Sequence, residues 1–397
     1  MGELEDRLER LAEHRAAQIP AFSMPPTDEL AVRRGVMRRH RLVVAIAACV
    51  AFALVIGGLL IFAHDSHGPT VETPAGTLPS TTDGGCTGKA YVNNSAHGTL
   101  SVLDTTTGAV TATIPVGQPE VGGQNGPFIS PDGKQLYVTH NLDGTATVIS
   151  TATDSVVATI PLGKEPFSIT FSPDSSRAYV THGDEGTLTV ISTATGQVAA
   201  TLRVGESRRV PQPNPIPSTM TPDGKHLYIN NTDGTLSVIT TGTGAASATI
   251  DVGTGPGEIA FTPDGKDAYV ANQTDGTVSV ITTATVAVSA TIPVGHGPLG
   301  IAFTPDGKYA YVTNNTDGTV SVITTATHAV SAPIAVGTQP VGVTITSDGK
   351  YAYVANNIDD TVSIITTATG AVSTPIPVGS RPRGIAVCPE PIANQPR

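Results

Sequence analysis

The stretch that decides the fold is Leu299-Gly-Ile-Ala-Phe-Thr-Pro-Asp-Gly-Lys-Tyr-Ala-Tyr-Val-Thr-Asn314, because its pattern recurs along most of the chain. The tetrapeptide that starts at its second tyrosine has seven copies, which begin at Tyr91, Tyr137, Tyr179, Tyr228, Tyr269, Tyr311 and Tyr353. Successive copies are 46, 42, 49, 41, 42 and 42 residues apart. A period near 42 residues indicates one small structural unit that is stacked on itself.

Each unit has the pattern of four short strands. In the copy quoted above we expect strands over residues 299–304, 309–314, 319–324 and 329–334, which are rich in β-branched and aromatic residues. Pro-Asp-Gly and Asp-Gly between these runs supply the turns. A unit of this length with four antiparallel strands has the size of a propeller blade, which buries its two faces only against neighbouring blades. The sequence therefore predicts an all-β fold, a seven-bladed β-propeller of four-stranded antiparallel blades.

The two ends of the repeat region complement each other. The first copy begins at Lys89 without the strand that should precede it, whereas the chain ends with an extra copy of that strand, Gly384 to Cys388. We expect this C-terminal strand to be the innermost strand of the first blade, so that three strands come from the N-terminal side and one from the C-terminal side. Such a 3+1 closure leaves no unpaired inner edge.

The alignment of the repeats also places two cysteines at this seam. Cys388 aligns with Thr304, just before the Pro-Asp-Gly turn, and Cys86 aligns with about Asp306 within it. The third cysteine of the chain, Cys49, lies in a hydrophobic segment. We therefore predict a Cys86–Cys388 disulfide that locks the ring, with two free thiols as the alternative.

Residues 42–63 form an uncharged hydrophobic segment that is long enough to cross a bilayer as a helix. Arginines precede this segment between residues 33 and 41, and acidic residues follow it at Asp65 and Glu72. By the positive-inside rule, the N-terminus stays in the cytoplasm and the propeller lies outside the cell, where a disulfide is stable. A cleaved signal peptide is the alternative, but no Ala-x-Ala site follows the segment. We expect an uncleaved, single-pass membrane anchor.

The other segments complete the predicted organisation. Residues 1–41 read as a cytoplasmic segment with a short amphipathic helix, in which Leu4, Leu8 and Leu11 share one face. Residues 64–85, rich in Pro, Thr, Ser and Gly, predict an extended linker; residues 86–389 form the propeller and residues 390–397 a tail. The chain has a formal net charge of −11 at pH 7, so we expect no nucleic-acid partner, because such binding depends on neutralising phosphates.

The repeat region of the chain resembles the YVTN-repeat β-propellers of bacterial and archaeal surface and secreted proteins. The likeness is carried by Tyr269-Val-Ala-Asn, Tyr311-Val-Thr-Asn and Tyr353-Val-Ala-Asn, together with Thr277-Val-Ser-Val-Ile and Gly300-Ile-Ala-Phe-Thr-Pro-Asp-Gly-Lys308. It covers about Cys86 to Pro389 and implies the propeller fold. For function it implies less, since propellers of this kind serve as adhesins, sensors, surface-layer parts and subunits of redox enzymes.

Loops that lead from the outermost strand of one blade to the innermost strand of the next predict the ligand face. Two of them, Gly117 to Pro127 and Gly205 to Pro217, are longer than the repeat requires, and loops on a rigid scaffold often carry binding residues. Glu258 replaces the glycine of other copies on an innermost strand, so its carboxylate should border the channel. The alternatives are neutral insertions and a solvated rim. The candidate ligand-binding residues, for a small anionic or zwitterionic ligand, are Glu120, Glu165, Glu206, Arg208, Arg209, Asn214, Glu258, Arg381 and Arg383.

His140 and His182 are a weaker candidate, for a metal site. Both occupy the position that holds asparagine in later copies. Equivalent residues of adjacent blades should lie on the order of 9 Å apart, too far for two imidazoles to bind one ion. We therefore expect no metal and no cofactor. The chain also lacks Gly-x-Ser-x-Gly, His-Glu-x-x-His, Cys-x-x-Cys and phosphate-loop motifs, so no catalytic residues are predicted.

Together these patterns favour a membrane-anchored, extracytoplasmic β-propeller that acts as a non-catalytic binding scaffold at the cell surface. Its partner would be a protein, a glycan or a small molecule outside the cell. One alternative is a metal-assisted lyase or lactonase that uses Glu258 with His140 or His182. Another is a purely structural component of the cell wall or surface layer.

Overall fold

The repeated β-branched runs form strands in a computed structural model that describes residues 86–119, 124–183, 186–203, 217–231 and 233–389. Three predicted segments, namely the cytoplasmic segment 1–41, the span 42–63 and the linker 64–85, lie outside these residues, as does the tail 390–397. Within the ranges just given, no helix is long and apolar enough to cross a membrane.

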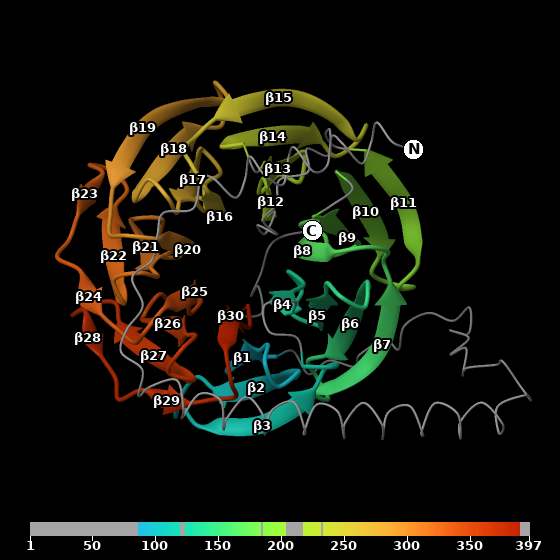
Figure 1. Ribbon diagram of the computed structural model, residues 1–397, viewed down its shortest axis with the longest axis horizontal. Coiled ribbons are helices and arrows are strands. Elements are labelled where there is room, and N and C mark those ends of the chain that lie inside the picture. Colours follow the sequence, from blue (N-terminus) through green and yellow to red (C-terminus); the bar gives the residue numbers. More distant parts are fainter. Residues whose placement is uncertain (1–85, 120–123, 184–185, 204–216, 232, 390–397) are drawn as a thin grey trace, which may run out of the picture. The chain divides into compact units, whose positions relative to one another are not determined.

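Seven antiparallel sheets stand around a central axis, as Figure 1 shows, and each sheet is one blade. The innermost strands, from blade 1 to blade 7, are β30 (Pro382–Val387), β4 (Gln124–Ile129), β8 (Pro166–Phe171), β12 (Ser218–Met220), β16 (Pro256–Phe261), β20 (Pro298–Phe303) and β25 (Pro340–Ile345). The second strands are β1 (Lys89–Asn94), β5 (Gln135–His140), β9 (Arg177–His182), β13 (His226–Asn230), β17 (Asp267–Asn272), β21 (Tyr309–Asn314) and β26 (Tyr351–Asn356). The third strands are β2 (Thr99–Asp104), β6 (Thr145–Ser150), β10 (Thr187–Ser192), β14 (Thr235–Thr240), β18 (Thr277–Thr282), β22 (Thr319–Thr324) and β27 (Thr361–Thr366).

The outermost strands separate the blades into two kinds. Blades 1 to 5 end in the continuous strands β3 (Val110–Pro115), β7 (Ser155–Pro161), β11 (Val198–Arg203), β15 (Ala245–Asp251) and β19 (Ala287–Pro293). In blades 6 and 7 this strand is broken into β23 (Ala329–Val330) and β24 (Ile334–Ala335), and into β28 (Ala371–Val372) and β29 (Ile376–Pro377). The predicted continuous strand 329–334 was therefore wrong. Pro333 lies in the gap and has no N–H to donate, so the ladder cannot run through it.

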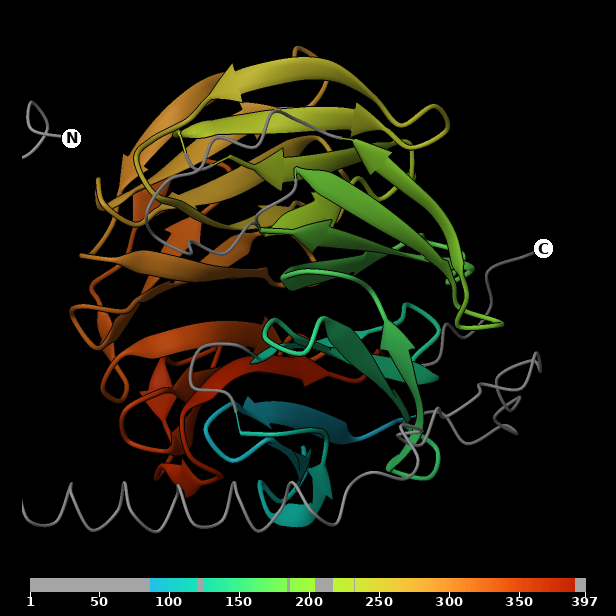
Figure 2. The ribbon, with the colours of Figure 1, turned by 45° about the vertical axis from the view of Figure 1, so that its right-hand side comes forward.

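The C-terminal strand closes the ring as predicted. β30 pairs antiparallel with β1, with Ala90 opposite Val387 and Tyr91 opposite Ala386. Figure 2 shows β30, in red, running beside β1, in blue. The first blade is therefore built from three N-terminal strands and one C-terminal strand, and its inner edge is paired.

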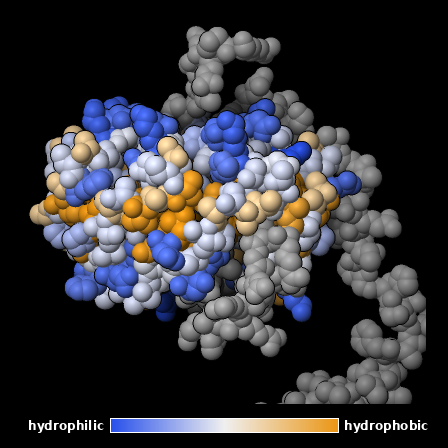
Figure 3. All heavy atoms as spheres, turned by 90° about the horizontal axis from the view of Figure 1, so that it is seen from above, coloured by the Kyte–Doolittle hydropathy of each residue, from blue (hydrophilic) through white to orange (hydrophobic). Residues whose placement is uncertain are grey.

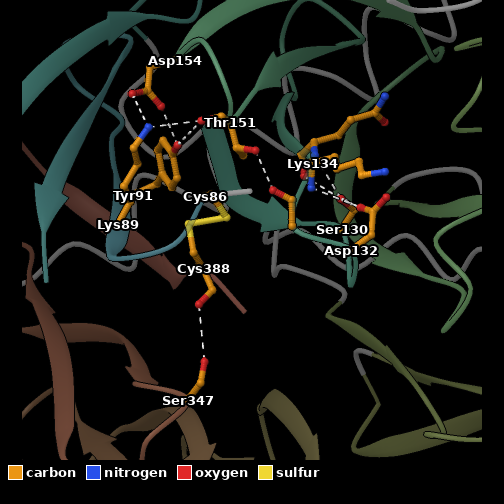
Figure 4. The surroundings of a disulfide bond; sticks show 12 residues. Cys86, Lys89, Tyr91, Ser130, Asp132, Lys134, Thr151, Asp154, Ser347 and Cys388 are labelled. Atoms are coloured by element: carbon orange, nitrogen blue, oxygen red, sulfur yellow. Dashed lines mark hydrogen bonds and ion pairs between the residues drawn. A yellow bond between two sulfur atoms is a disulfide. The ribbon is translucent and has the colours of Figure 1, made fainter. Parts of the chain in front are cut away.

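The predicted disulfide is confirmed at this seam. Cys86 and Cys388 are bonded, their Cα atoms are 5.4 Å apart, and both side chains are buried. Figure 4 shows a second tie close by, where Lys89 Nζ lies 2.7 Å from a carboxylate oxygen of Asp154 in blade 2. Tyr91 donates its hydroxyl proton to the same carboxylate, and burial raises the pKa of Tyr91. The seam thus joins blade 1 both to the C-terminus and to its neighbour.

The tyrosine of the repeated tetrapeptide packs one blade against the next. The Tyr269 ring meets Phe303 of blade 6 edge to face, with ring centroids 5.0 Å apart, and Tyr228 meets Phe261 in the same way. The Tyr353 hydroxyl donates to the Thr105 carbonyl across the seam between blades 7 and 1, at 3.0 Å. Aromatic pairs of this geometry add about 0.5–1.5 kcal/mol beyond the area that they bury. The tyrosine recurs because each boundary between blades needs it.

Glycines let the innermost strands approach one another around the channel. A Cβ atom on Gly300 would lie 2.5 Å from the Val341 carbonyl oxygen of blade 7, and one on Gly342 would lie 2.8 Å from the Arg383 carbonyl oxygen of blade 1. The same atom on Gly384 would overlap the carbonyl of Gly126 in blade 2. A side chain at this position would therefore force neighbouring innermost strands apart along this arc of the ring.

The outer wall of the ring carries an apolar band. Figure 3 shows this band on the visible wall, between two hydrophilic rims. Exposed valines recur near the beginning of several outermost strands, namely Val110, Val156, Val198, Val330 and Val372, which are 37–46% exposed. These residues lie at blade edges, which is where an exposed strand can pair with another chain, and the prolines of blades 6 and 7 limit such pairing.

Candidate functional site

The antiparallel order of the blades gives the ring two distinct faces. The loops that lead into the innermost strands and the turns between second and third strands emerge together, and we name this the loop face. The turns between first and second strands, such as 304–308, and between third and outermost strands, such as 325–328, form the opposite face, which we name the turn face. The predicted ligand residues that the structure describes, Glu165, Glu258, Arg381 and Arg383, belong to the loop face or to the channel just inside it.

A constant hydrogen-bond network supports the loop face. Asn314 donates to Thr319 Oγ1 at 3.0 Å and to Ser321 Oγ at 2.9 Å, and its Oδ1 accepts from Gly295 N at 3.1 Å. A Cβ atom on Gly295 would lie 2.5 Å from Asn314 Cγ, so the glycine of the repeat is required here. Asn272, Asn356 and Asn94 donate to Thr and Ser hydroxyls in the same way. The network fastens the loop of each blade to its third strand.

The two candidate histidines take part in this network. Nε2 of His140 lies 2.9 Å from Thr147 Oγ1, and Nε2 of His182 lies 2.9 Å from Thr189 Oγ1. Both rings are buried, and desolvation lowers the pKa of His140, so its imidazole is neutral at pH 7. No three His, Cys, Asp or Glu side chains of the described chain could hold one metal ion. Each histidine replaces an asparagine as a structural donor or acceptor.

Glu165 and Arg381 occupy the turn that precedes an innermost strand. Their φ angles are +48° and +56°, in a conformation for which other blades use glycine, such as Gly297 with φ +68°. The Glu165 carbonyl accepts from Gly183 N at 3.0 Å, and Arg381 N donates to Asp360 Oδ1 at 2.8 Å. A side chain in this conformation costs roughly 1 kcal/mol relative to glycine. Two charged residues are therefore kept on the loop face at a cost in stability.

Two charged side chains lie on the innermost strands within the described residues, Glu258 on β16 and Arg383 on β30. Counted from the loop face, Glu258 is the third residue of its strand and Arg383 is the second, so both lie just inside the channel mouth. Glu258 Oε2 accepts from Ile301 N of blade 6 at 3.1 Å. In blade 3, Ser168 Oγ accepts from Ser218 N of blade 4 at 3.4 Å, which is the same interaction between blades.

The surroundings shift the pKa of both groups. The Glu258 side chain has an exposed surface, but it stands on an innermost strand and the blades of the ring surround it. The resulting desolvation raises the pKa of Glu258 from 4.5 to about 7, and the hydrogen bond from Ile301 opposes this rise. Arg383 is half-buried, and desolvation lowers the pKa of its guanidinium. Arginine nonetheless stays protonated, and no hydrogen bond or ion pair joins this guanidinium to another described side chain.

Five of the predicted ligand residues, Glu120, Glu206, Arg208, Arg209 and Asn214, lie outside the described residues. The predicted loop 205–217 also lies almost wholly outside them. Of the loop Gly117 to Pro127, residues 124–127 are strand, because β4 begins at Gln124. The inserted residues therefore precede Gln124. Alignment of Gly126 with Gly300, both facing a neighbouring strand, could have placed this boundary from the sequence.

The turn face holds clefts that the sequence did not predict. They lie between blades 4 and 5, 5 and 6, and 6 and 7, with volumes of about 460, 540 and 290 Å³. Each is lined by a Thr-Pro-Asp turn of one blade and by Gly and Thr-Ala of the next blade. Because Pro-Asp-Gly-Lys recurs, it reads as turn chemistry alone in the sequence. The clefts arise only when neighbouring turns meet.

Comparison with known proteins agrees with this geometry. A family model described as "Lactonase, 7-bladed beta-propeller" matches residues 93–288 and 282–390. The chain belongs to this family. A search of curated proteins found no significant match.

Solved structures resemble this lactonase-family propeller in fold. "Kuenenia stuttgartiensis Hydrazine Synthase" is 22% identical with a TM-score of 0.62, and the match covers 71% of this chain and 93% of that one. A functionally unknown protein from Desulfotomaculum acetoxidans DSM 771 is 19% identical with a TM-score of 0.64, covering 76% of this chain and 99% of that one. "Dihydro-heme d1 dehydrogenase NirN in complex with DHE" is 19% identical with a TM-score of 0.59, covering 78% and 77%. At these identities the likeness shows the fold alone.

Proposed function

We propose that this lactonase-family propeller is a YVTN-type, non-catalytic binding scaffold, displayed outside the cell on a transmembrane helix at residues 42–63 with its N-terminus in the cytoplasm. Its ligand is a small zwitterionic or anionic molecule bound at the channel mouth of the loop face, and protein or glycan partners remain alternatives at the same face. The observation that carries this proposal is the pair of charged side chains, Glu258 and Arg383, on the innermost strands.

The two side chains offer complementary chemistry. Arg383 has no ion pair or hydrogen bond among the described residues and is partly desolvated, so it would bind a carboxylate strongly. Glu258 would accept hydrogen bonds from an ammonium group, and such a neighbour would lower its pKa from about 7. The rigid ring holds both groups in place before the ligand arrives, so binding does not have to order the scaffold. Glu165 and Arg381 would contact the part of the ligand that projects toward solvent.

The test is a thermal-shift and calorimetric titration of the full chain with glycine, glutamate, lysine, lactate and succinate. We expect at least one of these probes to raise the melting temperature. Arg383→Gln should abolish the shift for every carboxylate, whereas Glu258→Gln should remove the preference for amino acids over hydroxy acids. Arg177→Gln, in the second strand of blade 3, is the matched control and should bind as the wild type does. Binding that survives Arg383→Gln would refute the proposal.

A second variant examines the long loop. Replacing residues 204–217 with the short loop Val294-Gly-His-Gly-Pro298 should weaken binding of the same probe if the loop covers the channel mouth. Unchanged affinity would remove the loop from the ligand face. The anchor is tested separately by protease treatment of intact cells, which should digest the propeller and spare residues 1–41.

Lactone hydrolysis is the second candidate, because the family description contains it and Glu258 has the pKa of a general base at neutral pH. Turnover of γ-butyrolactone or an aldonolactone by the full chain, lost in Glu258→Gln, would favour this enzyme over a scaffold.

A further inference from the structure

One position on the turn face varies from blade to blade within a constant frame. It is the first residue of the second strand, and its occupants in blades 1 to 7 are Lys89, Gln135, Arg177, His226, Asp267, Tyr309 and Tyr351. The residues that follow this position are nearly constant, since they form the buried core of each blade. All seven occupants are polar or aromatic, and none is aliphatic. A variable position on a constant repeat is where repeat proteins place the residues that contact a ligand.

In three successive blades this position lines a cleft. His226 lines the cleft between blades 4 and 5, Asp267 the cleft between blades 5 and 6, and Tyr309 the cleft between blades 6 and 7. Tyr309 is 43% exposed, although a tyrosine ring has much apolar surface to bury. The clefts thus form a row along adjacent blades, with the same walls and a different side chain in each.

The cleft walls match a chain of neutral hydroxyl-bearing units. Thr and Asp side chains recur in all three clefts and offer hydroxyl and carboxylate partners. The carboxylate of each turn is paired with a lysine two residues on, as Asp264 is with Lys266 at 2.8 Å and Asp306 with Lys308 at 2.8 Å. Asp267 accepts from Thr282 Oγ1 and forms no ion pair with a described lysine or arginine. The turn charges are therefore balanced and Asp267 adds one negative charge in the middle cleft, which favours a neutral ligand over a polyanion. The apolar face of a sugar ring can lie on the exposed Tyr309 ring while its hydroxyls meet the walls.

An extended peptide fits these clefts less well. Peptides that bind β-proteins usually add a strand to an unpaired edge. The strand residues that line the two clefts of blades 5 to 7, Asp267 and Tyr309, belong to β17 and β21, which are hydrogen-bonded to a neighbour on both sides. A peptide main chain would find no partner there, whereas a sugar chain needs none.

We propose that the three turn-face clefts between blades 4 and 7 form one continuous site for a neutral linear polysaccharide, in which His226, Asp267 and Tyr309 contact successive sugar units. This site is separate from the loop face, so it goes beyond the proposed function and stands without it. Binding of several units to linked clefts adds their contributions through effective concentration, and affinity therefore rises with the length of the sugar chain.

The experiment is affinity electrophoresis of the full chain in gels that contain a β-1,4-glucan, β-1,3-glucan, α-1,4-glucan, mannan or xylan. We expect retardation by at least one of these polysaccharides. Tyr309→Ala should raise the dissociation constant for that polysaccharide about tenfold, because the variant loses an aromatic anchor. Asp267→Asn should also lower the affinity for the polysaccharide without straining the fold. Arg177→Ala is the matched control, at the same strand position in a blade outside the row, and should change affinity less than about twofold.

Oligosaccharides of the polysaccharide that binds test the continuity of the site. A hexasaccharide should compete at least about tenfold better than a disaccharide. Equal competition by both would refute the continuous site, and so would retardation that persists unchanged in Tyr309→Ala and Asp267→Asn. The absence of retardation by all five polysaccharides would also refute the proposal. The variant with the grafted loop at residues 204–217 should keep its polysaccharide binding, so that failure of the loop-face proposal can be told from failure of this one.

Discussion

Replacement of Gly300 by alanine tests whether the innermost strands depend on close approach. The added Cβ would lie 2.5 Å from the Val341 carbonyl oxygen and 3.2 Å from Thr313 Oγ1. An ordinary contact needs the two strands to separate by about 1 Å. Overpacking of this kind costs about 1–3 kcal/mol. The separation also stretches the bond from Thr313 Oγ1 to the Val341 carbonyl, now 2.8 Å, which is worth about 1 kcal/mol.

One effect acts in the opposite direction. Alanine reduces the conformational freedom of the unfolded chain relative to glycine and thereby stabilises the fold by about 0.4–1 kcal/mol. The net expectation for Gly300→Ala is a loss of about 2 kcal/mol in the free energy of unfolding. Gly242 is the matched control, because a Cβ atom there meets no atom within 4 Å and its backbone is not left-handed. Gly242→Ala should be neutral or slightly stabilising.

The assay is urea unfolding of both variants and the wild type, followed by circular dichroism in the same buffer. A lower midpoint for Gly300→Ala with an unchanged slope would show lost stability rather than a changed unfolded state. If Gly300→Ala unfolds within about 0.5 kcal/mol of Gly242→Ala, then the inner strands are not held by this contact and the reasoning fails.

Three further variants follow from the same structure. Val286 has φ +53° at a turn where Gly108, Gly196 and their equivalents occur, so Val286→Asn should raise the free energy of unfolding by up to about 1 kcal/mol; an unchanged melting temperature would contradict this. Glu258 has a folded pKa of about 7 against 4.5 unfolded, so it stabilises the protonated fold below pH 4.5 and loses that contribution as the pH rises to 7. Glu258→Gln should therefore gain stability over the wild type between pH 4.5 and 7, and a difference that is constant across this range would refute the shift. Loss of the disulfide, which joins residues 302 apart, in the double variant Cys86→Ala and Cys388→Ala should cost up to about 6 kcal/mol by the chain-entropy model, and equal urea midpoints would exclude a role in stability.

The fold was predictable because the same strand and turn pattern occurs in seven copies. Pro-Asp-Gly turns and β-branched runs recur at one spacing, so a misread strand in one copy is corrected by the others. The closure by β30 and the Cys86–Cys388 bond followed from alignment of an incomplete first copy with an incomplete last one. The broken outer strand of blade 6 was misread, because alternation continues through Pro333 even though its nitrogen cannot donate.

The candidate site was less predictable, because its geometry depends on neighbouring blades. The sequence showed that Glu258 replaces a glycine, yet the raised pKa of its carboxylate and its bond to Ile301 arise from blade 6. His97 shows the same limit. In the sequence it interrupts a run of turn aspartates, whereas in the fold its Nδ1 accepts from Ser380 N at 3.1 Å, just as Asp359 accepts from Thr338 N at 2.6 Å. A substitution that looks functional in the sequence can preserve a structural hydrogen bond in the fold.

The distribution of change around the ring connects the two proposed sites. Blades 5 to 7 keep nearly the same turn sequences, and a row of equal walls suits a ligand that is itself periodic. Blades 2 to 4 contain the inserted loops and the two histidines, and such irregular surroundings suit a single small ligand at one place on the rim. Positions that face another blade, such as Tyr269 and Gly300, cannot vary without loss of packing. Substitutions at the loop face, the channel mouth and the first residue of each second strand do not disturb this packing, and these are the places where the two proposals put ligands.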